Sequence, residues 1–225
     1  MILKSTDDVV TYLTETARRA DRGEIPEAWG VFTRAYLRVT LEIIARIADG
    51  YFEDPSWLAA FDVRFANKYK DAIDALPGSP RCWNIAREVA EAGGRDVLQH
   101  LMLGINAHMR YDLCVVLLDG FVDDRERRKR DFDAVNRVMK LAVDPIEAVI
   151  EDRYMRWARI GDGVGLRIDE LLTYERFVKW RTRAWEDAMA ILDGTLTRDA
   201  VDSRVSQRAR AMKYIPGVVL AVAPF

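Results

Sequence analysis

Apolar residues recur at every third or fourth position through most of the chain. Between residues 28 and 49 the apolar stripe consists of Trp29, Phe32, Tyr36, Val39, Ile43 and Ile47. This is the period of an amphipathic α-helix. The same spacing predicts further helices over residues 9–20, 55–76, 81–92, 130–143, 145–160, 168–192 and 197–214. Breaks rich in Gly, Pro and Asp separate these segments, and no alternating run predicts a β-strand.

Residues 95–118 have a different pattern, because apolar side chains cover almost the whole circumference of the predicted helix. A helix that is apolar all round is expected to be buried. We therefore predict an all-α fold. The expected architecture is a single-domain bundle of about eight helices that spans residues 1–225, with 95–118 as its buried central helix.

Composition narrows the classes of partner. The chain has 225 residues, with 34 Lys and Arg against 36 Asp and Glu, for a net charge of −2. A near-neutral chain without a basic cluster argues against binding to nucleic acid or to an anionic membrane. The sequence has no export signal and no run of about 18 apolar residues, which favours a cytoplasmic protein without a membrane span. Cys82 and Cys114 lack nearby partners in sequence and are expected to be free thiols.

Both histidines of the chain lie on the predicted central helix. His108 and Asp112 are four residues apart, so the carboxylate can orient the imidazole as a general base. On an ideal α-helix His100 and Tyr111 fall on the same stripe, and either is a candidate acid or donor to an oxyanion. Gly104, between the histidines, leaves room for a ligand or for a neighbouring helix. Since an α-helix rises 1.5 Å per residue, the two histidines are about 12 Å apart along the axis, which disfavours a shared single metal ion.

Other polar residues are candidates for contacts with a substrate. Neighbouring helices bring them toward the histidine stripe, although helix caps and surface pairs are the ordinary roles of such residues. The candidates are Asn106, Asp62, Arg64, Tyr69, Asp131 and Asn136.

Residues His100 to Leu113 read H-L-M-L-G-I-N-A-H-M-R-Y-D-L. This string resembles the signature H-L-x-L-G-x-N-A-H-x-x-x-D-L of a bacterial all-helical family of unknown function, and the resemblance extends from about Trp57 to Val143. It implies a helical fold and no particular reaction. A second similarity is to helical zinc phospholipase C and P1-type nucleases. The chain departs from that group, because Gly104 stands where an Asp is required and the chain has only 2 His.

These patterns predict an enzyme that modifies a hydrophobic small molecule by His/Asp acid–base chemistry in an aromatic-lined pocket. Cyclisation, elimination or isomerisation fits better than hydrolysis, since no nucleophile stands out. No cofactor and no metal are expected. One alternative is a non-catalytic binding or interaction protein with a buried His–Asp network. A second alternative is a metal-dependent hydrolase, which would need carboxylates from other helices, such as Asp62 or Asp131.

Overall fold

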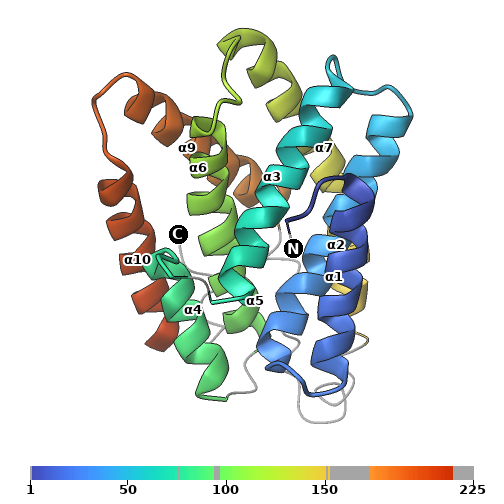
Figure 1. Cartoon of the computed structure of the whole chain (residues 1–225), viewed down its shortest axis with the longest axis vertical. Helices are drawn as coiled ribbons and strands as arrows, with labels where there is room; N and C mark the ends of the chain where they lie inside the picture. Colours follow the sequence, from blue (N-terminus) through green and yellow to red (C-terminus); the bar gives the residue numbers. More distant parts are fainter. Residues whose placement is uncertain (1, 76, 94–96, 151, 153–172, 215–225) are drawn as a thin grey trace.

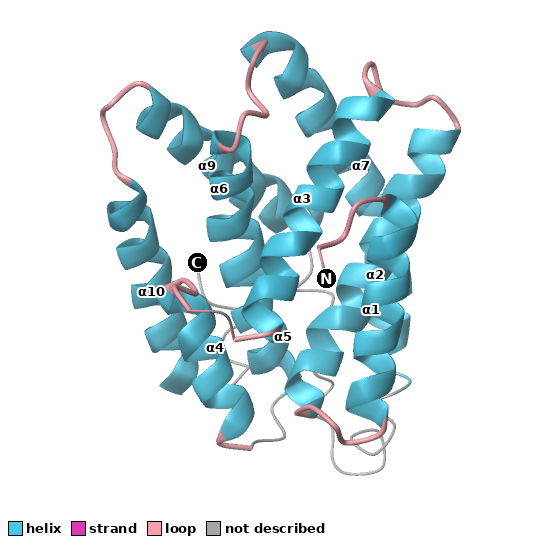
Figure 2. Cartoon of the chain, viewed as in Figure 1, coloured by secondary structure: helices cyan, strands magenta, loops and turns pink. Residues whose placement is uncertain are grey.

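The structure is a computed structural model that describes residues 2–75, 77–93, 97–150, 152 and 173–214. Within these ranges the only regular secondary structure is helix (Figures 1 and 2). The prediction of an all-α bundle is therefore confirmed. The helices are α1 (Thr6–Asp21), α2 (Glu27–Ala48), α3 (Pro55–Ile73), α4 (Arg81–Glu91), α5 (Val97–Ile105), η1 (Asn106–Asp112), α6 (Leu113–Leu118), α7 (Arg125–Ile150), α9 (Tyr174–Leu192) and α10 (Arg198–Tyr214).

Helices α5, η1 and α6 follow one another without a break and form the central helix of the bundle. In Figure 1 it runs between α4, α9 and α10 on one side and α1, α2 and α3 on the other. Segment Val97–Leu118 is long and apolar enough to cross a membrane. However, the other helices bury 89% of its most apolar window, so its apolar surface is used to form the core.

The middle of this helix has π-helical geometry, which the apolar pattern does not predict. The backbone N–H of Leu113 donates to the carbonyl of His108, five residues earlier, instead of four. Such segments are rare and often lie at functional sites. Because each π turn holds an additional residue, side chains after Asn106 are rotated relative to the positions expected for a regular α-helix. The predicted stripe of polar residues is therefore not a single stripe.

Gly104 allows α2 to approach the central helix closely. A Cβ atom at this position would lie 2.6 Å from both Cγ and Cδ2 of Phe32. Of the two roles left open by the sequence, the structure thus supports room for a neighbouring helix and not room for a ligand.

Gly104→Ala is expected to destabilise the protein by about 1–3 kcal/mol, because the added methyl group overpacks the contact with Phe32. Urea unfolding followed by far-UV circular dichroism measures the loss. In a Phe32→Ala background the same substitution should cost much less, since the clashing ring is absent. An equal cost in both backgrounds would show that the Phe32 contact is not the cause.

Helix α7 corrects two predictions. The apolar spacing predicts two separate helices, over 130–143 and 145–160, yet Arg125–Ile150 is one helix that starts within the charged segment 123–129 and has Pro145 inside it. At its start, the Asp124 carboxylate accepts the backbone N–H of Arg127, so part of the charged run caps the helix. Beyond the proline, Ile146 and Ile150 are buried, and their packing opposes the usual breaking effect of proline.

Smaller differences concern the ends of helices. The N-cap of α1 is Ser5, in a capping box with Asp8. Asp54 caps α3 by accepting the backbone N–H of Trp57. The glycine-rich segment 161–165, the start of the predicted helix 168–192 and the apolar segment 215–225 lie outside the described residues.

Candidate functional site

A largely apolar cavity lies among α2, α3, the central helix, α7 and α9. Its volume is about 70 Å³. A single water molecule needs roughly 10–15 Å³ of such a volume. The cavity therefore has room for on the order of five waters or a short alkyl chain, and it is about half the size of the roughly 150 Å³ apolar cavity that takes up a benzene ring. Most of the lining side chains are apolar. The polar or charged ones are Tyr36, Asp62, His108 and Arg181.

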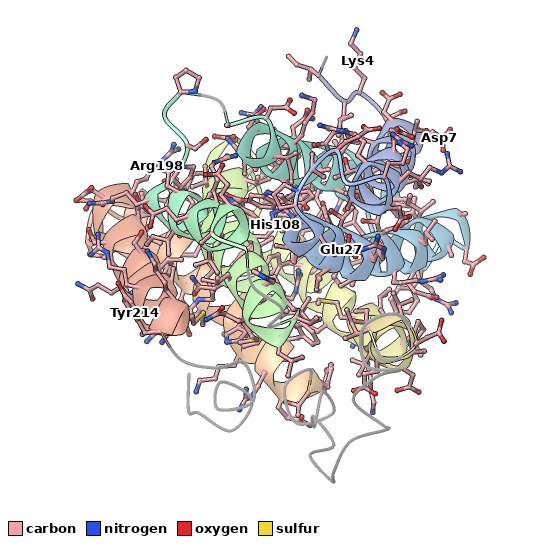
Figure 3. All side chains as sticks on the ribbon, turned by 90° about the horizontal axis from the view of Figure 1, so that it is seen from below. Lys4, Asp7, Glu27, His108, Arg198 and Tyr214 are labelled. Carbon is pink, nitrogen blue, oxygen red and sulfur yellow. The ribbon has the colours of Figure 1, made fainter. Side chains whose placement is uncertain are left out.

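His108 is at the centre of an aromatic cluster on this cavity, and Figure 3 shows it in the interior of the bundle. Its ring stacks on Phe65, with ring centroids 3.6 Å apart and an angle of 9° between the planes. The ring of Tyr36 approaches edge-on at 4.7 Å, and that of Phe32 at 5.7 Å. The side chain is almost completely buried. These contacts fix the orientation of the imidazole before any ligand binds.

A hydrogen-bonded triad ties His108 to two other side chains. His108 Nδ1 lies 2.9 Å from Asp112 Oδ2, and the same oxygen accepts the indole N–H of Trp83 at 2.8 Å. All three residues are buried. Trp83 belongs to α4, so the triad also connects α4 to the central helix. The pairing of His108 with Asp112, predicted from their spacing, is present in the structure.

Burial determines the protonation of this pair. Burial lowers the pKa of His108 below its usual value of 6.5, although the hydrogen bond and the charge of Asp112 oppose this shift. Burial also raises the pKa of Asp112, against the effect of its bonds to His108 and Trp83. At neutral pH the imidazole is therefore neutral. Because Nδ1 faces a carboxylate, it carries the proton, and Nε2 has a free lone pair. Nε2 is buried without a hydrogen-bond partner.

Magnetic resonance of ¹⁵N-labelled histidine can test this state, because the chain has only 2 His. We expect one imidazole to remain neutral with the proton on Nδ1 down to below pH 6.5. Asp112→Ala removes the acceptor that fixes this tautomer, so the Nδ1–H signal should be lost or shifted in that variant. A His108 pKa above 6.5 would contradict the dominance of burial.

Asp62 is the second titratable group on the cavity. It is 4% exposed, its Oδ2 has no hydrogen-bond partner, and burial alone raises its pKa to about 7. Near neutral pH it is partly protonated and can donate as well as accept a proton. The buried hydroxyl of Tyr36 also lacks a partner, and burial raises its pKa well above 10, with a smaller contribution from the charge of Asp62. Two unpartnered groups thus accompany His108.

Arg181 is a buried cation on the same cavity. Its Nε donates to Asn136 Oδ1 at 2.7 Å, and its Nη2 donates to the Phe132 carbonyl at 2.6 Å. Its guanidinium carbon lies 4.1 Å from the centroid of the Phe132 ring. No ion pair with a carboxylate of the described residues balances its charge. Burial lowers its pKa to about 9, so it remains charged at neutral pH.

Three residues predicted to share the site with His108 lie elsewhere. His100 and Gly104 line a separate small pocket against Trp29 and Phe32. Tyr111 is half-buried and lines a pocket beside the loop 77–80. The π segment separates these residues, because it starts between Gly104 and His108 and rotates the side chains beyond it. The histidine stripe is thus divided among three places, and of these residues only His108 lies on the cavity among α2, α3, α7 and α9.

The other sequence candidates, except Asp62, also lie off the cavity lining. Asn106 donates to the Val205 carbonyl of α10. Arg64 forms an exposed ion pair with Asp119. Both contacts hold helices together.

Tyr69, Asp131 and Asn136 have comparable supporting roles. Tyr69 hydrogen-bonds through its hydroxyl to Thr33 at 2.7 Å, and its ring lies 5.7 Å from that of His108. Both carboxylate oxygens of Asp131 accept backbone N–H groups, from residues 53 and 54. Asn136 accepts the bond from Arg181 and so supports a residue of the cavity without lining it.

The described residues contain no group of three His, Cys, Asp or Glu side chains placed to hold a metal ion. Of the two carboxylates named for the metal-hydrolase alternative, Asp62 lines the cavity with His108, whereas both oxygens of Asp131 accept backbone N–H groups. Cys82 and Cys114 are buried free thiols, as expected. Burial raises the pKa of both, which makes them poor nucleophiles.

Sequence reasoning missed Tyr36, Trp83 and Arg181. For Arg181 a signal existed, because it lies on the apolar stripe of its helix, four residues after Phe177 and four before Trp185. A charge on an apolar stripe is expected either to be paired or to serve a ligand. No signal linked Trp83 to Asp112, since their pairing depends on how α4 packs against the central helix.

The fold and the site together define an all-α helical bundle with a small internal cavity, apolar except for a few buried titratable or charged groups. Residues 6–215 match the family described as Family of unknown function (DUF5995). The chain belongs to this family, and the match extends well beyond the segment on which the resemblance rested. No curated protein and no solved structure matches the chain.

Proposed function

We propose that this protein is an enzyme that moves protons within a small, mostly apolar substrate, in an isomerisation, elimination or cyclisation. The observation that carries the proposal is the state of His108. Its Nδ1 is hydrogen-bonded to Asp112. Its Nε2 is buried without a hydrogen-bond partner, and the residue lines the cavity. A neutral imidazole with an oriented lone pair is suited to act as a general base.

The proposed chemistry uses two groups with different roles. His108 Nε2 accepts a proton from the substrate, and Asp112 stabilises the resulting imidazolium across the 2.9 Å contact. Asp62, with a pKa of about 7, returns a proton at another position of the substrate or donates to a developing oxyanion. A general acid or base works best when its pKa lies near the working pH. Asp62 takes the role of acid in place of His100 and Tyr111, which lie outside the cavity.

The aromatic and aliphatic walls favour an apolar substrate, and the volume of about 70 Å³ limits it to a molecule smaller than a benzene ring. The walls bring few polar groups to hold a water molecule, which fits a rearrangement better than a hydrolysis. The chemistry of these residues requires no cofactor.

A second candidate is a non-catalytic packing role for the triad. It is favoured by the bond from Trp83 to Asp112, which joins α4 to the central helix. In that case the lone pair on His108 would be incidental, and the protein would act as a binding or interaction module.

The test compares wild-type protein with His108→Gln on a library of apolar compounds smaller than a benzene ring, with mass spectrometry and proton–deuterium exchange as readouts. Loss of a general base should lower the rate by about 10²–10⁴-fold. The same substitution at His100 should have the smaller effect, because His100 lies outside the cavity. Unchanged helix content would show that His108→Gln still folds. Equal rates for wild type and His108→Gln would favour the non-catalytic role.

A further inference from the structure

Arg181 has more hydrogen-bonding capacity than the protein uses. A guanidinium group carries five N–H donors, and the bonds from Arg181 to Asn136 and to the Phe132 carbonyl use two of them. The residue is 6% exposed, and it lines the cavity. A buried cation is costly unless an anion or several acceptors compensate it.

The charges around Arg181 do not supply this compensation. The acidic group that acts on it most is Asp133, one turn away along α7 from Asn136, and it forms no ion pair with Arg181. Asp133 is instead paired with Lys129. Asp62 lies on the same cavity, but its Oδ2 has no partner, and burial is the only cause of its raised pKa. The two groups are therefore not in direct contact.

The guanidinium group is also held in a fixed position. Its contacts with Asn136 and Phe132 come from α7, whereas Arg181 belongs to α9, so the two helices orient it together. A planar donor group that is fixed and not fully used matches the geometry of a carboxylate.

From this arrangement we infer that the cavity takes a small apolar carboxylate, whose charged end pairs with Arg181 and whose hydrocarbon part lies against the aromatic walls near His108. The reaction of this carboxylate at His108 rests on the proposed function, whereas its binding at Arg181 does not. The ligand would be a short alkyl carboxylic acid of about three or four carbons, because the cavity of about 70 Å³ is too small for a benzene ring. The carboxylate anchors it, and proton transfer takes place on its apolar part.

The test measures binding without turnover, by titration calorimetry at neutral pH. The probes are propionate and butyrate, the uncharged propanol and butanol, and the cationic propylamine. We expect the carboxylates to bind at least about tenfold more tightly than the alcohols of the same size, and the amine to bind most weakly. This order reflects the strength of a charge-assisted hydrogen bond in a buried site.

The variant Arg181→Met should remove the preference for carboxylates while it keeps an apolar side chain of similar length. Arg183→Met is the matched control, because Arg183 is an exposed arginine on the same helix that pairs with Glu186. It should bind the carboxylates as wild type does. If Arg181→Met does not fold, the ranking of the five probes on wild-type protein still decides the question. Equal binding of carboxylates and alcohols, or tighter binding of the amine, would overturn the inference.

Failure of this inference can be told apart from failure of the proposed function. If carboxylates bind selectively but wild type and His108→Gln turn over nothing, the anchor is correct and the enzyme proposal is not. If uncharged compounds are turned over through His108 with no preference for carboxylates, the enzyme proposal stands and the anchor at Arg181 is wrong.

Discussion

Replacement of Asp112 by alanine is expected to destabilise the protein by about 3–5 kcal/mol, the usual cost of removing one partner from a buried charged network. One oxygen of Asp112 accepts from both His108 and Trp83. Its loss leaves two buried N–H groups without an acceptor and weakens the link between α4 and the central helix. Urea unfolding monitored by far-UV circular dichroism and by tryptophan fluorescence measures the change.

Two control variants sharpen this result. Asp112→Asn keeps an oxygen that can accept from both donors, so its loss of stability should be clearly smaller than that of Asp112→Ala. Asp71→Ala removes an exposed carboxylate that lies outside the triad and should change stability by less than about 0.5 kcal/mol. If all three variants were equally stable, the triad would contribute little to the fold.

The second large effect concerns Asp62, whose replacement by asparagine should stabilise the protein in a manner that depends on pH. The folded-state pKa of Asp62 is about 7, against an ordinary value of 3.8. A raised pKa means that the folded state binds the proton more tightly than the unfolded state. The contribution to stability is therefore complete below pH 3.8 and is lost as the pH rises toward 7. At 1.36 kcal/mol per pKa unit, the loss in the free energy of unfolding approaches about 4 kcal/mol.

Asparagine does not titrate, so Asp62→Asn should avoid this loss. Relative to wild type it should be about equally stable at pH 4 and more stable by up to about 4 kcal/mol at pH 8. Comparison of the two proteins at each pH removes the contributions of His108 and Asp112, which they share. Asp71→Asn serves as the exposed control. A stability difference that is the same at pH 4 and pH 8 would show that Asp62 is not a buried titrating group. Any proton transfer through Asp62 should be lost in the stabilised variant.

The sequence predicted most of the helices because their apolar stripes are strongly periodic. The described part of the central helix, Val97 to Leu118, lies within the predicted range 95–118. It also predicted the contact between His108 and Asp112, since a separation of four residues along a helix brings two side chains together. What these successes share is that local spacing determines the result.

The remainder of the site depends on packing between helices. The indole of Trp83, the ring of Phe65 and the guanidinium of Arg181 reach the cavity region from three different helices, and no local pattern relates them. The separation of His100 and Tyr111 from His108 had another cause. Their positions were inferred for a regular α-helix, whereas the backbone from Asn106 to Asp112 has a wider turn.

The wider turn between Asn106 and Asp112 also bears on which changes of chain length the central helix can tolerate. A deletion in a regular α-helix turns all later side chains by about 100°, which would remove Leu113, Val116 and Leu117 from their contacts in the core. Within the π segment, a deletion can instead be absorbed by a return to ordinary α-helical bonding, because the segment already contains one more residue per turn. Family members that lack one residue there would keep the same bundle, but their histidine would face a different neighbour.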